Sequence, residues 1–233
     1  MLYEHILKRS VSARYPIRVI QNGYYAIRSL PVTTTPFKLK FENTTLCNLK
    51  CKMCPLSVGL KRPVGSLSYE NFKFVFDQIY PCYLNLTGIG EPFLNKDIFD
   101  IIKYAKDKST FVKLDSNATL LTRERGIQML EATPDILSIS MDGATKETYE
   151  RIRVPAKFET FLENTRNFIQ LRNEMKKFKT EIHTFMVVQR DNFHELPDYI
   201  KLANELGADS INGTFVIRLG NNENDDTGLD NIT

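Results

Sequence analysis

Short strand-like runs alternate with helix-like patterns through most of this 233-residue sequence, beginning near residue 37. The six strand candidates are Phe37–Asn43, Tyr83–Thr87, Phe111–Asp115, Ile136–Met141, Ile182–Val188 and Ser210–Val216. Apolar residues recur at helical spacing between them, and such alternation implies a parallel sheet with helical crossovers. Six steps are fewer than the eight of a full TIM barrel. We therefore expect an α/β fold that forms an open, partial (β/α)6 TIM-like barrel.

The helices expected between these strands have recognisable start and stop residues. Ser68 is the expected N-cap of the first of them, and Asn95 is expected to open a helix over Lys96–Asp107. Further helices are expected to begin near Thr122, as a short turn from Thr145, over Phe158–Met175, and over Pro197–Leu206, which Gly207 ends.

The alternation divides the chain into a core over residues 37–217 and two flanking segments. The N-terminal extension, residues 1–36, carries Lys8, Arg9, Arg14, Arg18 and Arg28 but only one acidic residue, Glu4. Asn22-Gly23 favours a small hairpin there. RNA, a phosphorylated substrate or a membrane surface are candidate partners of this extension, and a simple solvated face is the alternative. Residues 218–233 are polar, and we expect a flexible tail or a truncation point.

Composition excludes several classes of protein. The chain is 42% hydrophobic and 25% charged, as in ordinary soluble proteins, and its net charge of +3 does not by itself indicate nucleic acid. No run of about 18 apolar residues is present, so no membrane span is expected. The N-terminus also lacks the pattern of a cleaved secretory leader. We expect a cytoplasmic enzyme.

Three of the four cysteines fall in the segment CNLKCKMC, directly after the first strand candidate. Cys47, Cys51 and Cys54 have C-x3-C-x2-C spacing, which suits three irons of a cubane cluster and leaves the fourth iron open. The alternative is a structural zinc site, which normally needs four ligands. The three histidines are remote in sequence but are not excluded as ligands. A non-catalytic iron–sulfur or zinc-binding scaffold protein therefore remains the hypothesis from another class.

With this spacing after the first strand of a β/α array, residues 37–217 resemble the radical S-adenosylmethionine (SAM) superfamily. The resemblance implies a [4Fe-4S] cluster whose open iron is chelated by SAM. It further implies reductive cleavage of SAM and hydrogen abstraction from an unknown substrate by a 5′-deoxyadenosyl radical. A reductant such as flavodoxin or ferredoxin is the implied partner. Met53, before the last cysteine, departs from the aromatic residue often found in the family.

The same resemblance assigns SAM contacts to the ends of later strands. Gly88, Gly90 and Glu91 match the family's glycine-rich motif, which recognises the methionine amino group, although an ordinary βα turn also explains them. The other matches are Asn117, Ser140 and Asp142 at strand ends, and Arg153 as a partner of the SAM carboxylate. Each of these residue types is also common in turns, caps and helix ends.

A few further positions are left open by the sequence. Glu42 and Lys113 are candidates for an acid, base or hydrogen donor inside the barrel. Met186–Val188 suits either an adenine wall or core packing, and Cys82 is expected to be a small buried core residue. The most similar enzymes often carry a C-terminal cysteine-rich (SPASM-type) extension that this sequence lacks. We therefore expect a one-cluster protein or a truncated core.

Overall fold

The computed structural model describes residues 14–29, 34–57, 59 and 61–215. Its strands are β1 (Lys38–Lys40), β2 (Tyr83–Asn85), β3 (Phe111–Ser116), β4 (Ile136–Ser140), β5 (Glu181–Val188) and β6 (Ser210–Phe215). Its α-helices are α2 (Arg14–Ile27), α3 (Tyr69–Ile79), α4 (Ile98–Asp107), α5 (Arg123–Ala132), α6 (Lys146–Ile152), α7 (Phe158–Glu174) and α8 (Leu196–Leu206). Two short 3-10 helices are η1 (Pro92–Leu94) and η2 (Phe193–Glu195).

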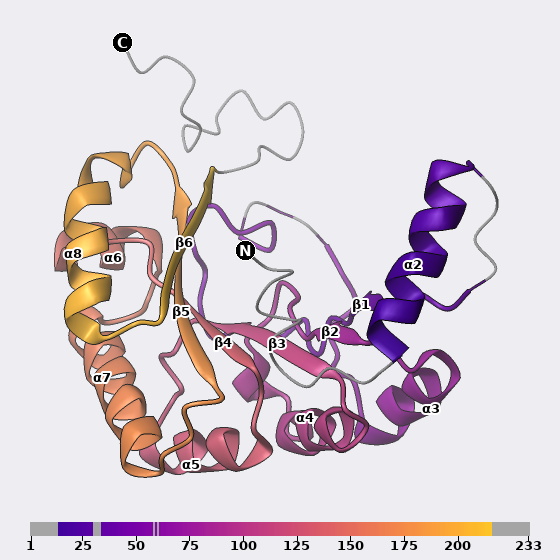
Figure 1. The fold of residues 1–233 in the computed structure, drawn as a ribbon. Helices are drawn as coiled ribbons and strands as arrows, with labels where there is room; N and C mark the ends of the chain where they lie inside the picture. Colours follow the sequence, from indigo (N-terminus) through magenta and orange to yellow (C-terminus); the bar gives the residue numbers. More distant parts are fainter. Residues whose placement is uncertain (1–13, 30–33, 58, 60, 216–233) are drawn as a thin grey trace.

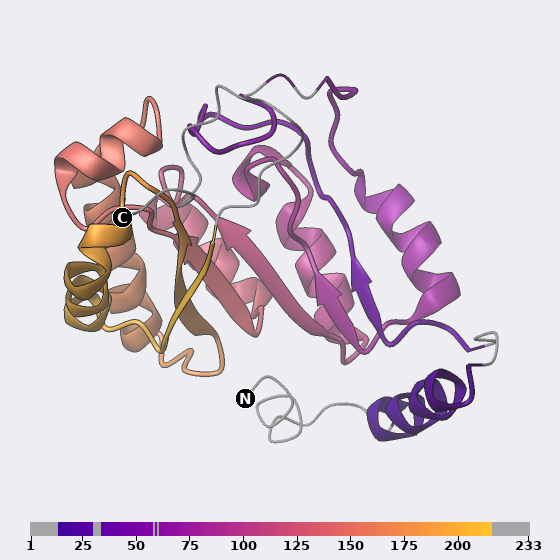
Figure 2. The same ribbon diagram turned by 90° about the horizontal axis from the view of Figure 1, so that it is seen from above.

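The six strands form one parallel sheet in the order β1-β2-β3-β4-β5-β6. Each strand therefore pairs with its neighbour in sequence, and every connection is a crossover through helix or loop. The sheet curls, and α3, α4, α5, α7 and α8 lie on its convex side (Figures 1 and 2). This arrangement confirms the expected partial (β/α)6 barrel.

Burial alternates along the strands as the two faces of the sheet require. In β3, Val112 and Leu114 are fully buried under the helices, whereas Lys113 and Asp115 are partly exposed. The eight residues of β5 alternate in the same way. Because successive side chains point to opposite faces, the helix-facing set builds the core and the other set lines the inside of the half-barrel. That inner face carries polar groups.

Most of the expected helix ends are confirmed. The side chains of Ser68, Thr122 and Thr145 cap α3, α5 and α6, and Gly207 ends α8 with a φ of +83°. Asn95 differs from the expectation, since α4 begins only after Asp97. The side-chain amide of Asn95 donates to the carbonyls of Asn43 and Leu67, and these hydrogen bonds hold the loop before α3.

The strands β1 and β2 are shorter than expected. Beyond Lys40 the chain leaves the ladder, and the side-chain amide of Asn43 donates to the Leu86 carbonyl at 2.6 Å. Cys82 lies at the start of β2, 4% exposed, in a small apolar cluster with Tyr83 and Phe111. The expectation of a buried core cysteine is thus confirmed.

The hairpin expected at Asn22-Gly23 is wrong, because both residues lie inside α2. Asn22 donates its side-chain amide to the Arg18 carbonyl one turn earlier and accepts a hydrogen bond from Thr34. These two hydrogen bonds satisfy the polar side chain of Asn22 inside the helix, although this residue type locally favours a turn. Val216 and the tail over residues 218–233 lie outside the described residues. None of the helices in the described part of the chain has the length and apolarity needed to cross a bilayer.

Candidate active site

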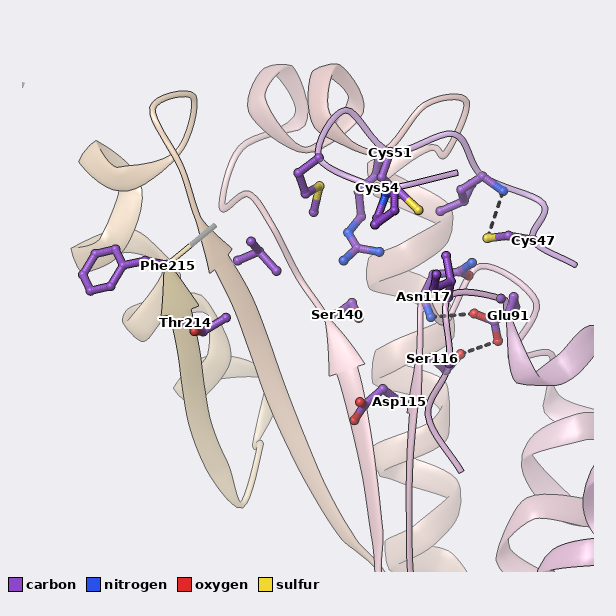
Figure 3. Close-up of a pocket in the computed structure, with 18 residues that line it drawn as sticks. Cys47, Cys51, Cys54, Glu91, Asp115, Ser116, Asn117, Ser140, Thr214 and Phe215 are labelled. Atoms are coloured by element: carbon purple, nitrogen blue, oxygen red, sulfur yellow. Dashed lines mark hydrogen bonds between the residues drawn. The ribbon is translucent and has the colours of Figure 1, made fainter. Parts of the chain in front are cut away.

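A cavity of about 470 Å³ opens at the carboxyl ends of the strands. Its lining includes the three clustered cysteines together with side chains from the ends of β2, β3, β4, β5 and β6 (Figure 3). Nearly all of the site residues predicted from the sequence meet there: Cys47, Cys51, Cys54, Gly88, Gly90, Glu91, Asn117, Ser140 and Arg153. Asp142 is the exception. The carboxyl edge of a parallel barrel is the usual place for such a site.

The cysteine loop is fixed by main-chain hydrogen bonds to other parts of the fold. The amides of Lys50 and Lys52 donate to the carbonyls of Val154 and Ile152, at 2.6 and 2.8 Å. On its other side, the Glu91 amide donates to the Leu46 carbonyl at 2.7 Å. The loop is therefore held between the end of α6 and the loop after β2.

The glycines after β2 allow this loop to come close. A Cβ on Gly90 would lie 2.3 Å from the Thr44 carbonyl oxygen, and one on Gly88 would lie 2.4 Å from Cγ of Glu42. At Gly90 the obstacle is backbone, so no side-chain movement relieves it. Gly90 therefore lies against the backbone that leads into the cysteine loop, and Gly88 lies against the Glu42 side chain, while both glycines also line the cavity.

The surroundings of Cys47 and Cys51 favour the protonated form of these two thiols as long as no metal is bound. Burial raises the pKa of Cys51 to about 11 and also raises the pKa of Cys47. The Arg153 guanidinium opposes both shifts by favouring the thiolates. Because thiolates are the ligands of iron, metal binding here has to release protons.

A single-ion zinc site does not fit this geometry. Among the described residues, no three His, Cys, Asp or Glu side chains gather closely enough to hold one metal ion. The three thiols nevertheless face one roomy cavity whose described lining contains no histidine and no fourth cysteine. Thiols spread around a cavity fit a multi-iron cluster that has one open iron.

Glu91 is buried at the wall of the cavity, with 2% of its surface exposed. Its Oε1 accepts a hydrogen bond from the Ser116 hydroxyl at 2.7 Å, and its Oε2 accepts one from the Asn117 amide at 2.8 Å (Figure 3). Oε1 also accepts a hydrogen bond from the Phe93 amide at 3.3 Å. Burial raises the pKa of this carboxyl, although these donors oppose the shift. Since a carboxylate oxygen accepts two hydrogen bonds, Oε2 retains room for one further donor.

Asn117 joins β3 to the cysteine loop. Its side-chain amide donates to Oδ1 of Asn48 at 3.0 Å, and the Asn48 amide donates in turn to the Thr119 hydroxyl at 2.9 Å. Asn48 lies between the first two cysteines. Asn117 was predicted from the sequence, whereas Asn48 was not, and its place between two clustered cysteines was the only available signal.

Arg153 and Asp142 form a buried ion pair. Nε and Nη2 of Arg153 donate to Oδ2 of Asp142 at 2.8 and 2.6 Å. Burial favours the neutral form of Arg153, but the Asp142 carboxylate outweighs this effect and raises the pKa of the guanidinium. A permanent positive charge therefore stands at the cavity wall, beside the cysteines.

The Asp142 side chain does not line the cavity but contacts other groups of the protein. Asp142 is fully buried, and its carboxylate is engaged by Arg153 and by the Val187 amide at 2.7 Å. It therefore orients Arg153 and ties the end of β4 to the end of β5. Ser140, two residues earlier, does line the cavity.

The lining residues contributed by the last strand were not named as site residues from the sequence. Thr214 and Phe215 of β6 lie on the other side of the cavity from Glu91 (Figure 3). Their place at the end of the last strand, equivalent to the other strand ends, was the available signal. Neither residue type suggests a ligand contact by itself.

The positions left open by the sequence now have defined contacts. Glu42 forms an ion pair with Arg62, at 2.6 Å, and accepts a hydrogen bond from the Ile89 amide, so it supports the glycine-rich loop. Lys113 pairs with Asp115 at 3.1 Å, and Asp115 lines the cavity. Of Met186–Val188, only Val187 lines the cavity, while Met186 is fully buried in the core.

Residues 42–203 match the sequence profile of the Radical SAM superfamily, and this chain belongs to that family. The [4Fe-4S] cluster and SAM are the family's cofactors, and the fold, the three-cysteine loop and the strand-end cavity described above agree with them.

Known proteins similar to this chain have different activities. It is 31% identical over 201 residues to the AdoMet-dependent heme synthase of Methanosarcina barkeri, covering 84% of this chain and 55% of that protein. It is 28% identical over 183 residues to the PqqA peptide cyclase of Bradyrhizobium diazoefficiens, covering 76% and 45%. The chain therefore spans about half the length of these curated relatives.

Solved structures show the same fold. SuiB of Streptococcus suis bound to S-adenosylmethionine superposes with a TM-score of 0.68 at 15% identity, over 91% of this chain and 49% of that one. At such low identity the similarity supports the architecture and does not extend to individual contacts.

Proposed function

We propose that this chain is a radical SAM enzyme core that holds a [4Fe-4S] cluster on Cys47, Cys51 and Cys54 and abstracts hydrogen from its substrate. The observation that carries this proposal is the meeting of the three thiols, Glu91 and Arg153 around one cavity. When bound, the cluster and SAM supply a 5′-deoxyadenosyl radical by one-electron cleavage of the sulfonium.

The residues of the cavity provide complementary charges for the amino-acid part of SAM. The free position on Oε2 of Glu91 suits an ammonium group, and the Arg153 guanidinium suits a carboxylate. Asp142 keeps Arg153 charged and oriented, while Ser116 and the Asn117 amide do the same for Glu91. The protein's part is thus to bind and orient SAM.

The substrate and the electron donor are separate questions. The Lys113–Asp115 pair offers both charges on the inner face of β3, where a substrate would approach SAM. A low-potential reductant such as flavodoxin or ferredoxin is the donor we propose. The four cysteines of the described residues form no disulfide with one another, which favours a reducing compartment, the cytoplasm.

The test is anaerobic reconstitution with iron and sulfide, followed by reduction with dithionite, addition of SAM and assay of 5′-deoxyadenosine. We expect product from the wild-type chain and none from Cys51→Ala, which should also lose the iron that wild type binds. Cys82→Ala is the matched control, because it removes a buried thiol outside the cavity and should retain both iron and product.

A bound cluster without 5′-deoxyadenosine would contradict the proposal and favour the non-catalytic iron–sulfur protein. Equal iron content in wild type and Cys51→Ala would instead show that the cysteine loop does not hold the cluster.

A further inference from the structure

Helix α2 presents an exposed apolar face. Ile17, Ile20, Tyr24 and Ile27 are 56%, 71%, 55% and 86% exposed. They follow one another at separations of three, four and three residues, so they lie along one side of the helix. Single exposed apolar residues are ordinary, but a row of four on one helix face marks an interaction surface.

The opposite side of α2 fixes the helix to the barrel. Val19 packs against the apolar cluster at the start of β2, β3 and β4. Nη1 of Arg18 donates to the carbonyls of Ile79 and Tyr80 at the end of α3. The helix is therefore held in place with its apolar face directed outward.

The charge of this segment is one-sided. No Asp or Glu occurs between Glu4 and Glu42, whereas Lys8, Arg9, Arg14, Arg18, Arg28, Lys38 and Lys40 do. The whole chain has a net charge of only +3, so the remainder is net acidic. The apolar face thus belongs to the most basic part of the molecule.

The place of α2 in the fold is also relevant. The helix lies beyond the amino-terminal ends of the strands, away from the cysteine loop at their carboxyl ends (Figure 2). The loop from α7 into β5 reaches the same end of the sheet and carries Lys176, Lys177 and Phe178, which is 61% exposed. Basic and exposed apolar side chains therefore recur at this end, opposite the cavity.

We propose that α2 docks the protein on the surface of an anionic membrane. Its apolar face enters the boundary between headgroups and acyl chains, and the positive charge of the same segment of sequence attracts the anionic lipid surface. A second copy of the chain is a poor occupant, because pairing through α2 would bring two strongly basic segments together. RNA would bind the basic residues, but its binding would not account for the three exposed isoleucines. Docking through this end leaves the cavity open to solvent.

The test is flotation of the full chain with vesicles of phosphatidylcholine alone and of phosphatidylcholine mixed with phosphatidylglycerol. We expect binding to the mixed vesicles that weakens with added salt, and little binding to the neutral ones. The double variant Ile20→Ser/Ile27→Ser should bind about tenfold or more weakly, because it removes two inserted side chains. Phe74→Ser is the matched control: it changes an apolar side chain of α3 that is 72% exposed, and should bind like wild type.

Each other outcome would overturn the proposal. Absence of binding to the mixed vesicles, or equal binding by the double variant, would show that the apolar face does not meet lipid. A concentration-dependent dimer that the double variant abolishes would assign the face to a second copy. Salt-sensitive binding of single-stranded RNA without vesicle binding would assign the basic segment to nucleic acid.

Discussion

The Glu91 carboxylate has a structural role as well as its proposed role in SAM binding. Three donors of the chain itself, the Ser116 hydroxyl and the amides of Phe93 and Asn117, already hold its two oxygens in place. These contacts join the loop after β2 to the end of β3. A change at Glu91 therefore has to be separated into its effect on stability and its effect on the cofactor.

We expect Glu91→Gln to retain iron but to bind SAM about tenfold to a hundredfold more weakly, because a charge-assisted hydrogen bond is lost. Equilibrium dialysis of SAM against the reconstituted protein measures the affinity, and iron analysis checks the cluster. Ser116→Ala is the matched control. It removes one of the contacts that hold Glu91 but leaves the carboxylate, so its SAM affinity should change less. An unaltered affinity in Glu91→Gln would exclude the carboxylate from SAM binding.

At the scale of elements, the short helix α6 links the cysteine loop to the strand ends. Its first turn is held by Glu195, whose carboxylate accepts hydrogen bonds from the Ala144 amide at 2.7 Å and the Thr145 hydroxyl at 2.6 Å. At its other end, the Ile152 carbonyl accepts from the Lys52 amide, and Arg153 follows directly. Glu195 thus acts on the site through the position of α6.

Glu195 also makes a contribution to stability that depends on pH. Burial opposes its ionisation, but hydrogen bonds from Thr145, Thr148 and Ala144 outweigh this and hold the pKa of the carboxyl below its ordinary value of 4.5. A lowered folded-state pKa means that the contribution is complete above pH 4.5 and is lost as the pH falls through the folded-state value.

Glu195→Gln should therefore lower the free energy of unfolding by about 1–2 kcal/mol at neutral pH. The difference from wild type should shrink in acid, where the wild-type carboxyl is also neutral. Urea unfolding at a series of pH values, in one cluster state, measures it. Glu147→Gln, at an exposed position in the same first turn, is the control and should change stability little. A difference that stays constant into acid would mean that ionised Glu195 does not stabilise α6.

Sequence patterns correctly predicted the helices and strands whose apolar residues recur at regular spacing. They failed where a contact with a distant part of the chain decided the secondary structure. The alternation in β3 and β5 and the caps at Ser68 and Thr145 are local signals, and the structure contains them. The helix α2 was missed because its stability depends on a distant contact, that of Val19 with the barrel, while Asn22-Gly23 locally favours a turn.

The site was predictable to the same extent. Strand-end motifs are bound to converge in a parallel barrel, so the meeting of Glu91, Asn117 and Ser140 at one cavity followed from their places in the sequence. What did not follow was which polar residue faces the cavity and which supports it. Asp142 lies outside the cavity lining and holds Arg153 by hydrogen bonds, and this pairing becomes apparent only in the folded structure.

The whole molecule is a half-barrel, and its two edge strands differ in protection. β1 is only three residues long and continues into the tethered cysteine loop. β6 is six residues long, pairs on one side with β5, and has exposed side chains at every position but Ser210. β4, in contrast, lies between two strands and is almost entirely buried. One wall of the proposed active site is thus the least protected strand of the sheet.

Hydrogen exchange should show this gradient directly. We expect the amides of Ser210–Phe215 to exchange about a hundredfold or more faster than those of Ile136–Ser140, because opening an edge strand does not require global unfolding. The amides of β5 are the internal control and should stay protected, since β5 keeps β4 as a partner when β6 opens. Protection of β6 equal to that of β4 would mean that another part of the chain, or a second copy, covers this edge.

Loading the site tests whether this wall contacts the ligand. Thr214 and Phe215 line the same cavity as the cysteines, so SAM added to the reconstituted protein should slow exchange in β6. In Cys51→Ala, which should hold no cluster, SAM should leave β6 unchanged. If β6 exchange is insensitive to SAM even where 5′-deoxyadenosine forms, SAM occupies only the side of the cavity near Glu91. The part beside β6 is then left for the substrate.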